Sequence, residues 1–319
     1  MCASVPQEEL YRMRVAITGA TGLIGRKLFA ALRERNAEVT ILSRNPAQAQ
    51  AILPHAAHYI AWEPAEQGAW GAAIAEVDAV IHLAGAPISK GLLGPRWSDS
   101  YKAEILNSRV IGTRGLVKAM RAAPTPPATF ICASAVGFYG PRDDSPLDEN
   151  AAAGDDFVAR VCKAWEAEAA QAASPQTRAV MLRTGLVLDP DDGVLPQIIM
   201  PFRTFTGGPM MPGTQYYSWI HPDDEIGLIL FALDHAAIQG PLNATAPAPV
   251  TNREFAETIG KVLNSPSWLA VPQTALRLML GEMADLIVTG QRVLPRKALD
   301  HGYQFRYTDL EAALRNLIK

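Results

Sequence analysis

A loop with glycine at every third position follows the first apolar segment of the chain. Arg14-Val15-Ala16-Ile17-Thr18 leads into Gly19-Ala20-Thr21-Gly22-Leu23-Ile24-Gly25. Glycine lets a backbone turn tightly and approach a phosphate without a Cβ in the way, and a helix that begins there offers free amides and the positive end of its dipole. Because the loop lies between a strand and a helix, the pattern predicts a dinucleotide-binding loop. The residues expected to contact the diphosphate are Gly19, Thr21, Gly22, Leu23, Ile24 and Gly25. The alternative is an ordinary glycine-rich turn.

The end of the second apolar segment indicates which dinucleotide binds. An acidic residue there would accept hydrogen bonds from a ribose 2′-hydroxyl, but this chain has Ser43 and Arg44. A guanidinium suits a 2′-phosphate, and the serine hydroxyl can add a hydrogen bond. The pair favours NADP(H), the alternative being a surface arginine at the start of a loop. Leu83, Ala84 and Gly85 should pass beneath the cofactor, because small residues at a strand's carboxyl end permit close approach.

Short apolar segments alternate with helical stretches and must position these residues. Strands are predicted at residues 14–18, 39–42, 59–62, 79–83, 129–133 and 178–182, with helices at 23–35 and 100–122 between them. Such alternation is typical of a parallel sheet covered on both faces. The predicted fold is therefore an α/β Rossmann fold, a doubly wound parallel sheet with a smaller C-terminal substrate or cap region.

The pattern changes after Asp189, where proline and glycine cluster. We expect an NADP-binding Rossmann domain at residues 13–189, with residues 217–245 returning to it, and a cap formed mainly by residues 190–319. In the cap we expect a strand or turn at 217–221 and helices at 223–235, 251–263 (with a threonine cap), 276–288 and 309–318.

Composition excludes several classes of protein. Of 319 residues 49% are hydrophobic and 19% charged, which is enough to bury a substantial core. The net charge of −3 gives no basic excess for nucleic acid or an acidic membrane surface. The three cysteines are too far apart for a metal motif and are expected to be reduced. We predict a cytoplasmic protein that acts on a small molecule, without contact to nucleic acid or membrane; the sequence leaves the oligomeric state open.

Together these features resemble the atypical extended short-chain dehydrogenases/reductases, NAD(P)-dependent epimerase-like proteins with a C-terminal domain of unknown function. The resemblance extends from Met13 to Ile318. Beyond the glycine loop and Leu83-Ala84-Gly85, it is carried by Arg96-Trp97, Ser134-Ala135-Val136-Gly137-Phe138-Tyr139-Gly140, Trp165-Glu166, Leu182-Arg183-Thr184-Gly185, Gly207-Gly208-Pro209, Trp219-Ile220-His221-Pro222-Asp223-Asp224 and Gly290-Gln291-Arg292-Val293-Leu294-Pro295.

The resemblance implies three further cofactor contacts. Glu104 and Arg109 match a helix that faces the cofactor, although a solvated helix with mixed charge is the alternative. Val187 matches a backbone contact near the nicotinamide.

The catalytic pattern of the family is incomplete in this chain. The family normally has a tyrosine proton donor four residues before a lysine on one helix. Lys163 is present, but Ala159 stands in place of the tyrosine. Ser134 lies one residue away from the usual serine position, which reverses its direction in a strand. Tyr139 could replace the lost phenol or pack in the core. The candidate catalytic residues are therefore Ser134, Tyr139 and Lys163, with a solvated lysine as the alternative for the last.

Other polar groups are weaker candidates. His221 could act as an acid or base, with Asp223 expected to cap the next helix. His82 is interpreted as a satisfied core histidine. Arg292, Arg296 and Lys297 could meet an anionic substrate, although a solvated face is favoured. No spacing suggests a metal site.

Two functions remain open. The first is an NADP(H)-binding, epimerase-like oxidoreductase that acts on an unidentified small molecule. The second is a non-enzymatic NADP(H)-binding sensor or interaction protein, which the loss of the usual acid at Ala159 favours.

Overall fold

The centre of the molecule is a seven-stranded sheet in which every neighbouring pair is parallel. The computed structural model describes residues 12–65, 68, 70–89 and 96–318. The strand order is β11-β7-β5-β4-β1-β2-β3. The strands are β1 (Arg14–Thr18), β2 (Glu38–Ser43), β3 (His58–Ala61), β4 (Ala79–His82), β5 (Thr129–Ala135), β7 (Arg178–Thr184) and β11 (Gly240–Ala244). The order runs outward in both directions from β1, which confirms the predicted doubly wound Rossmann sheet.

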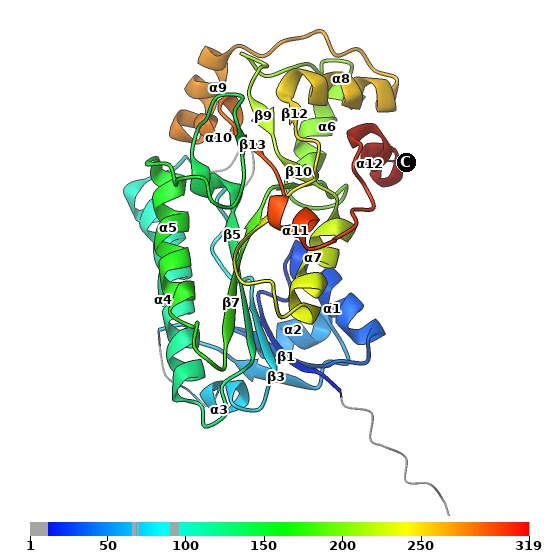
Figure 1. Ribbon diagram of the computed structural model, residues 1–319. Coiled ribbons are helices and arrows are strands. Elements are labelled where there is room, and N and C mark those ends of the chain that lie inside the picture. Colours follow the sequence, from blue (N-terminus) through cyan, green and yellow to red (C-terminus); the bar gives the residue numbers. More distant parts are fainter. Residues whose placement is uncertain (1–11, 66–67, 69, 90–95, 319) are drawn as a thin grey trace, which may run out of the picture.

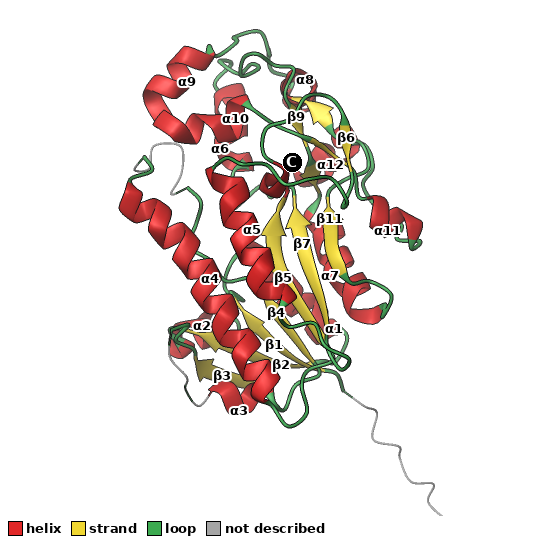
Figure 2. Ribbon diagram, turned by 60° about the vertical axis from the view of Figure 1, so that its left-hand side comes forward, coloured by secondary structure: helices red, strands yellow, loops and turns green. Residues whose placement is uncertain are grey.

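Helices cover both faces of the sheet (Figures 1 and 2). One layer holds α1 (Leu23–Glu34), α2 (Pro46–Ile52) and α7 (Pro222–Asp234), and the other holds α3 (Trp70–Ile74), α4 (Asp99–Ala122) and α5 (Phe157–Ala170). Successive side chains of a strand point to opposite faces. Val15 and Ile17 accordingly pack with the first layer, and Ala16 packs with the second. Burial on both faces explains why these strands are continuously apolar.

The C-terminal region lies beyond the carboxyl ends of the strands (Figure 1). Its core surrounds Trp219 and draws on α6 (Leu195–Arg203), α8 (Asn252–Leu263) and α12 (Leu310–Leu317). Short strand pairs tie it down: β8 (Leu186–Val187) with β10 (Trp219–Ile220), β9 (Tyr216–Tyr217) with β12 (Val250–Thr251), and β6 (Pro146–Leu147) with β13 (Arg292–Val293). The 3₁₀ turn η1 (Val136–Tyr139) follows β5, and α11 (Arg296–Asp300) lies beside β11.

Most predicted elements are present, and the differences have local causes. Thr251 caps α8 through a reciprocal capping box with Glu254, as the sequence predicted. The prediction of a single helix at residues 276–288 was wrong. The chain forms α9 (Gln273–Leu280), a 3₁₀ turn η2 (Gly281–Ala284) and α10 (Asp285–Val288), because Gly281 has a φ of +61° that an α-helix cannot continue. The segment 217–221 is divided between β9 and β10.

In the described part of the chain, none of the helices combines the length and apolar character that crossing a bilayer requires.

Candidate cofactor site and adjoining pocket

The glycine loop after β1 leaves no room for side chains at two of its positions. Gly19 has a φ of +71°, and a Cβ there would lie 2.8 Å from the amide nitrogen of Ala84, in the segment that follows the neighbouring strand β4. A Cβ on Gly25 would lie 2.4 Å from the carbonyl oxygen of Gly19. Gly22 is the N-cap of α1, no side chain caps that end, and the first turn contains no acidic residue. The positive end of α1 is therefore left for an anion.

The segment after β4 closes against the same loop. The Leu83 amide donates to the Thr18 carbonyl at 3.1 Å. Arg109 of α4 donates to the Ala86 carbonyl at 2.9 Å, and a Cβ on Gly85 would meet the guanidinium at 3.2 Å. Burial lowers the pKa of Arg109. Arg109 thus holds the Gly85 segment in place, whereas Glu104 is exposed on the same helix.

Ser43 and Arg44 lie at the turn between β2 and α2. The Ser43 hydroxyl accepts a hydrogen bond from the Asn45 amide at 3.2 Å, and its own proton remains for a second partner. The Arg44 side chain is exposed. Asn45 caps α2 by accepting from the Gln48 amide. Ser43 and the exposed Arg44 therefore lie where β2 ends, at the carboxyl edge of the sheet.

A loop from the C-terminal part of the chain is fastened to the start of α1. Arg26 bridges the Thr21 carbonyl, at 2.9 Å, and the Asp192 carboxylate, at 2.7 Å. Lys27 pairs with the buried Asp189 at 3.0 Å, and Asp189 also accepts the amides of residues 191 and 192. The glycine loop is therefore held from both sides.

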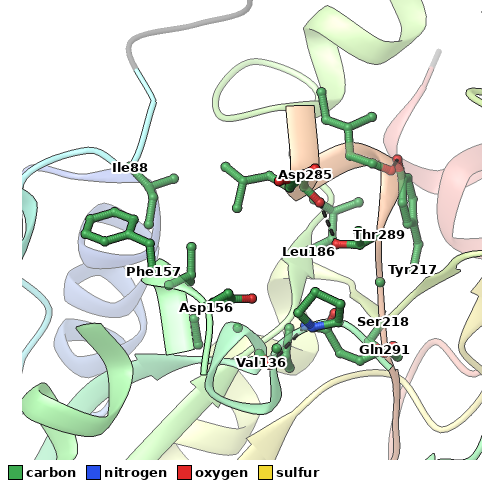
Figure 3. Close-up of a pocket in the computed structure, with 18 of the residues that line it drawn as sticks. Ile88, Val136, Asp156, Phe157, Leu186, Tyr217, Ser218, Asp285, Thr289 and Gln291 are labelled. Atoms are coloured by element: carbon green, nitrogen blue, oxygen red, sulfur yellow. Dashed lines mark hydrogen bonds between the residues drawn. The ribbon is translucent and has the colours of Figure 1, made fainter. Parts of the chain in front are cut away.

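A pocket of about 730 Å³ lies between the carboxyl ends of the strands and the C-terminal region. The Rossmann side supplies residues 135–137 from the end of β5 and 184–186 from the end of β7, while the other side supplies residues 216–218, 285–287 and 289–291. Figure 3 shows Ile88 and Phe157 across the cavity from Asp285 and Tyr217. Gln291 donates to the Val136 carbonyl at 2.9 Å and so joins the two sides. Val187, expected near the nicotinamide, follows the lining residue Leu186 in β8.

Sequence reasoning missed most of these lining residues. Gln291 belongs to a motif that carried the family resemblance, but no role followed from it. Its neighbour Gly290 provided a signal, because a Cβ there would lie 2.1 Å from the Tyr216 carbonyl and this close approach requires glycine.

Thr184, which lines the pocket, donates to the buried carboxyl of Glu225 at 2.8 Å. Burial raises the pKa of Glu225 to about 8, and the hydrogen bond from Thr184 offsets part of that increase. This pair was not predicted, because Glu225 lies in the first turn of α7 and has the sequence context of an exposed residue.

The Glu225 carboxyl makes stability depend on pH. Its pKa rises from an unperturbed value of 4.5 to about 8, so folding takes up a proton between these pH values. The stabilisation is complete below pH 4.5 and is lost as the pH rises through 8. We expect the wild-type protein to lose stability relative to Glu225→Gln between pH 6 and pH 8, by about 1 kcal/mol per pH unit or less. Urea denaturation at both pH values measures this difference, and parallel profiles for the two proteins would contradict it.

Ser134 and Tyr139, two of the three candidate catalytic residues, belong to one buried polar network. Ser134 donates to Glu166 at 2.6 Å, and Arg183 donates to both oxygens of that carboxylate at 2.8 Å. Arg183 also donates to the Tyr139 hydroxyl at 2.9 Å, which donates to Asn243 at 2.7 Å. Burial raises the pKa of Tyr139 to about 12. Both hydroxyls are occupied by protein partners, and neither residue lines the pocket.

Lys163, the third candidate, does not belong to this buried network. Its side chain is exposed on α5, whereas Ala159 one turn earlier is fully buried. The pocket is lined instead by Asp156, Phe157 and Val158 at the start of this helix. The usual arrangement of tyrosine and lysine beside the nicotinamide ribose is therefore absent from this helix.

The weaker candidates have structural partners. The prediction that Asp223 caps α7 was wrong. The cap is His221, whose side chain accepts a hydrogen bond from the Asp223 amide at 3.0 Å. The His221 ring also stacks on the ring of Tyr307. His82 is a core histidine, as expected, but only one of its two ring nitrogens is satisfied: Nδ1 lies 2.6 Å from the Thr18 hydroxyl, whereas the buried Nε2 has no hydrogen-bond partner among the described residues. Burial lowers the pKa of His82 to about 3.

The three basic residues near the C-terminus do not act together. Lys297 donates to the Gln239 and Pro241 carbonyls, whereas Arg296 is paired along α11 with Asp300. Arg292 lies over the Tyr216 ring. The three side chains therefore do not converge on one anion.

The family model for the NAD dependent epimerase/dehydratase family matches residues 15–244, and a domain of unknown function matches residues 271–317. The chain is 39% identical over its whole length to an Arabidopsis thaliana protein named epimerase family protein SDR39U1 homolog, chloroplastic, of which it covers 90%. It is 38% identical to the Bacillus subtilis epimerase family protein YfhF, covering 96% of this chain and 98% of that protein.

Among solved structures, human epimerase family protein SDR39U1 (isoform 2) with NADPH matches with a TM-score of 0.84 and 34% identity, covering 96% of this chain and 99% of the other. The family model covers most of the chain, and the relatives match along almost all of it. The chain therefore belongs to the NAD-dependent epimerase/dehydratase family.

Proposed function

We propose that the protein binds NADP(H) along the carboxyl edge of its sheet and acts as an oxidoreductase on a small molecule in the adjoining pocket. The observation that carries this proposal is the glycine loop, where a Cβ at Gly19 or Gly25 would overlap neighbouring backbone and α1 begins without a side-chain cap. A relative of 34% identity is described with NADPH, which supports the choice of cofactor.

In this proposal each part of the site has one task. The amides at the start of α1 hold the diphosphate, and Arg44 with Ser43 holds the 2′-phosphate. Ala84 and Gly85 form the floor, with Arg109 fixing the segment from α4. When bound, the cofactor supplies or accepts a hydride. The hydroxyl of Thr184 lines the pocket and is hydrogen-bonded to the Glu225 carboxyl, whose pKa is raised to about 8. To protonate a substrate, Thr184 would give up its own proton and take the proton of Glu225, which reverses the direction of their hydrogen bond and leaves Glu225 as the carboxylate.

Removing the Arg44 guanidinium should weaken the binding of NADPH but not that of NADH. We expect Arg44→Ala to weaken NADPH binding by about 2 kcal/mol, a factor of about 30, because a charged hydrogen-bonding partner of the 2′-phosphate is lost. NADH binding should hardly change, since NADH has no phosphate there. Calorimetric titration measures both affinities. Arg121→Ala, at the far end of α4, is the control. An equal loss for NADH and NADPH would contradict the assignment.

A second function, a non-enzymatic NADP(H) sensor, is favoured by one observation: α5 carries buried Ala159 and exposed Lys163 where a catalytic pair would stand. The two functions differ in turnover. Steady oxidation of NADPH that is lost in Thr184→Val, with cofactor affinity retained, excludes the sensor. Tight cofactor binding with no turnover of any carbonyl compound would exclude the enzyme.

The cellular compartment is part of the proposal as well. Cys132 and Cys162 are buried, unpaired thiols, in keeping with a reducing compartment such as the cytoplasm.

A further inference from the structure

The walls of the pocket are mainly apolar on both sides of the cavity. Figure 3 shows Ile88 and Phe157 on one side and Leu186 and Tyr217 on the other. Trp97, Met210, Leu286 and Ile287 extend this apolar lining. Leu286 is 40% exposed, so the apolar surface continues to the rim. An apolar substrate would lose water-exposed surface along its whole length on entering this cavity.

Among the described residues that line the pocket, the number of positively charged side chains equals the number of negatively charged ones. The cations are Lys102, Arg160 and Arg277, and the carboxylates are Asp156, Glu282 and Asp285. Lys102 is paired with Glu282, and Arg277 is paired with Asp285 at 3.1 Å. These pairs are partly exposed and weak. However, drawing Arg277 away toward a phosphate would leave the Asp285 carboxylate beside the new negative charge.

Helix ends at the pocket also offer little to an anion. At the start of α6, Pro196 has no amide hydrogen, and the amides of Gln197 and Ile198 already donate to the Val194 carbonyl. The start of α5 is capped by the carboxylate of Asp156, which accepts from the Ala159 amide at 2.7 Å. A diphosphate near this end would be repelled by Asp156 instead of attracted by the helix dipole.

We propose that the substrate of this pocket is an uncharged molecule with an extended apolar body, and not a nucleoside diphosphate sugar. The inference rests on the proposed function, since it assigns the substrate class of that same site. Its basis is the combination of apolar walls, balanced charges and occupied amides. A diphosphate placed here would lose its hydration and gain little in return, because Lys102 and Arg277 are already paired with carboxylates and Arg160 donates to the Asp155 carbonyl.

Three probes test the proposal on the NADPH-loaded protein by calorimetry. They are 2-decanone, its ω-carboxylate 9-oxodecanoate, and UDP-glucose. The first two have the same chain length and the same ketone, and differ in charge. We expect saturable binding of 2-decanone at least about tenfold tighter than that of 9-oxodecanoate, and no saturation with UDP-glucose. Failure of 2-decanone to saturate, or saturation by UDP-glucose, would overturn the proposal.

A pair of variants checks that the pocket causes this preference. Leu286→Lys places a cation at the pocket rim and should reduce the difference between the two ketones at least about threefold. Leu299→Lys is the control, because Leu299 is 43% exposed on α11 and does not line the pocket. An unchanged preference in Leu286→Lys would count against this pocket as the binding site.

Measuring NADPH binding before the probes are added distinguishes a failure of this proposal from a failure of the proposed function. If NADPH does not bind the protein, the proposed function fails. If NADPH binds but the ketones behave otherwise than expected, only the assignment of the substrate class fails.

Discussion

Gly19→Ala is expected to weaken NADPH binding by about 100-fold or more, equivalent to about 2.7 kcal/mol. The residue has a φ of +71°, where a Cβ is strained, and that Cβ would lie 2.8 Å from the backbone of Ala84. Because the obstacle is backbone and not a flexible side chain, the loop or the segment after β4 must shift. Either shift moves the amides at the start of α1 away from the diphosphate. Calorimetric titration with NADPH measures the loss.

Gly71→Ala is the matched control for this experiment. Gly71 has no heavy atom within 4 Å of the position a Cβ would take. Cofactor affinity and melting temperature should both stay close to those of the wild type. If Gly19→Ala bound NADPH within threefold of the wild type, the glycine loop would not be the diphosphate site.

Glu166→Ala is expected to destabilise the protein by about 3–5 kcal/mol, because it leaves the Arg183 guanidinium buried without its counter-charge. Glu166 is 7% exposed and Arg183 3% exposed, and two hydrogen bonds of 2.8 Å join them. The same change removes the acceptor of Ser134. Urea denaturation followed by circular dichroism gives the loss in free energy of unfolding.

Two further variants separate the charge from the packing. The double variant Glu166→Leu with Arg183→Met removes both charges and should recover most of the lost stability. Glu168→Ala removes a partly exposed carboxylate on the same helix, which is paired with Arg114, and should change stability far less. If Glu166→Ala were no worse than Glu168→Ala, the network around Arg183 would not support the fold.

The sheet and the glycine loop could be predicted because their signals are local. Alternating apolar strands and helices determine the doubly wound topology, and the loop after β1 is contiguous in the chain. The ends of elements were predicted less accurately: β5 continues to Ala135, beyond the predicted end at residue 133. The break at Gly281 was missed because an apolar periodicity of 3.6 runs through η2 without showing the glycine's positive φ.

The pocket could not be predicted because its walls meet only in three dimensions. Gln291 and Val136 are joined by a hydrogen bond across 155 positions of the chain. Ser134 and Tyr139 were plausible catalytic groups from their place at the end of β5. The sequence did not show that Glu166 of α5 and Arg183 of β7 converge on their hydroxyls. Ser134 and Tyr139 therefore have a structural role, which their hydrogen-bond partners on α5 and β7 determine.

The proposed cofactor site has two parts: the glycine-lined start of α1 binds the diphosphate of NADP(H), and Arg44 binds its 2′-phosphate. Calorimetric titration of the purified protein with NADPH and with NADH tests it most directly. We expect saturable binding of one NADPH per chain and an affinity for NADH at least about tenfold weaker. No saturation with either nucleotide, or equal affinity for both, would contradict it.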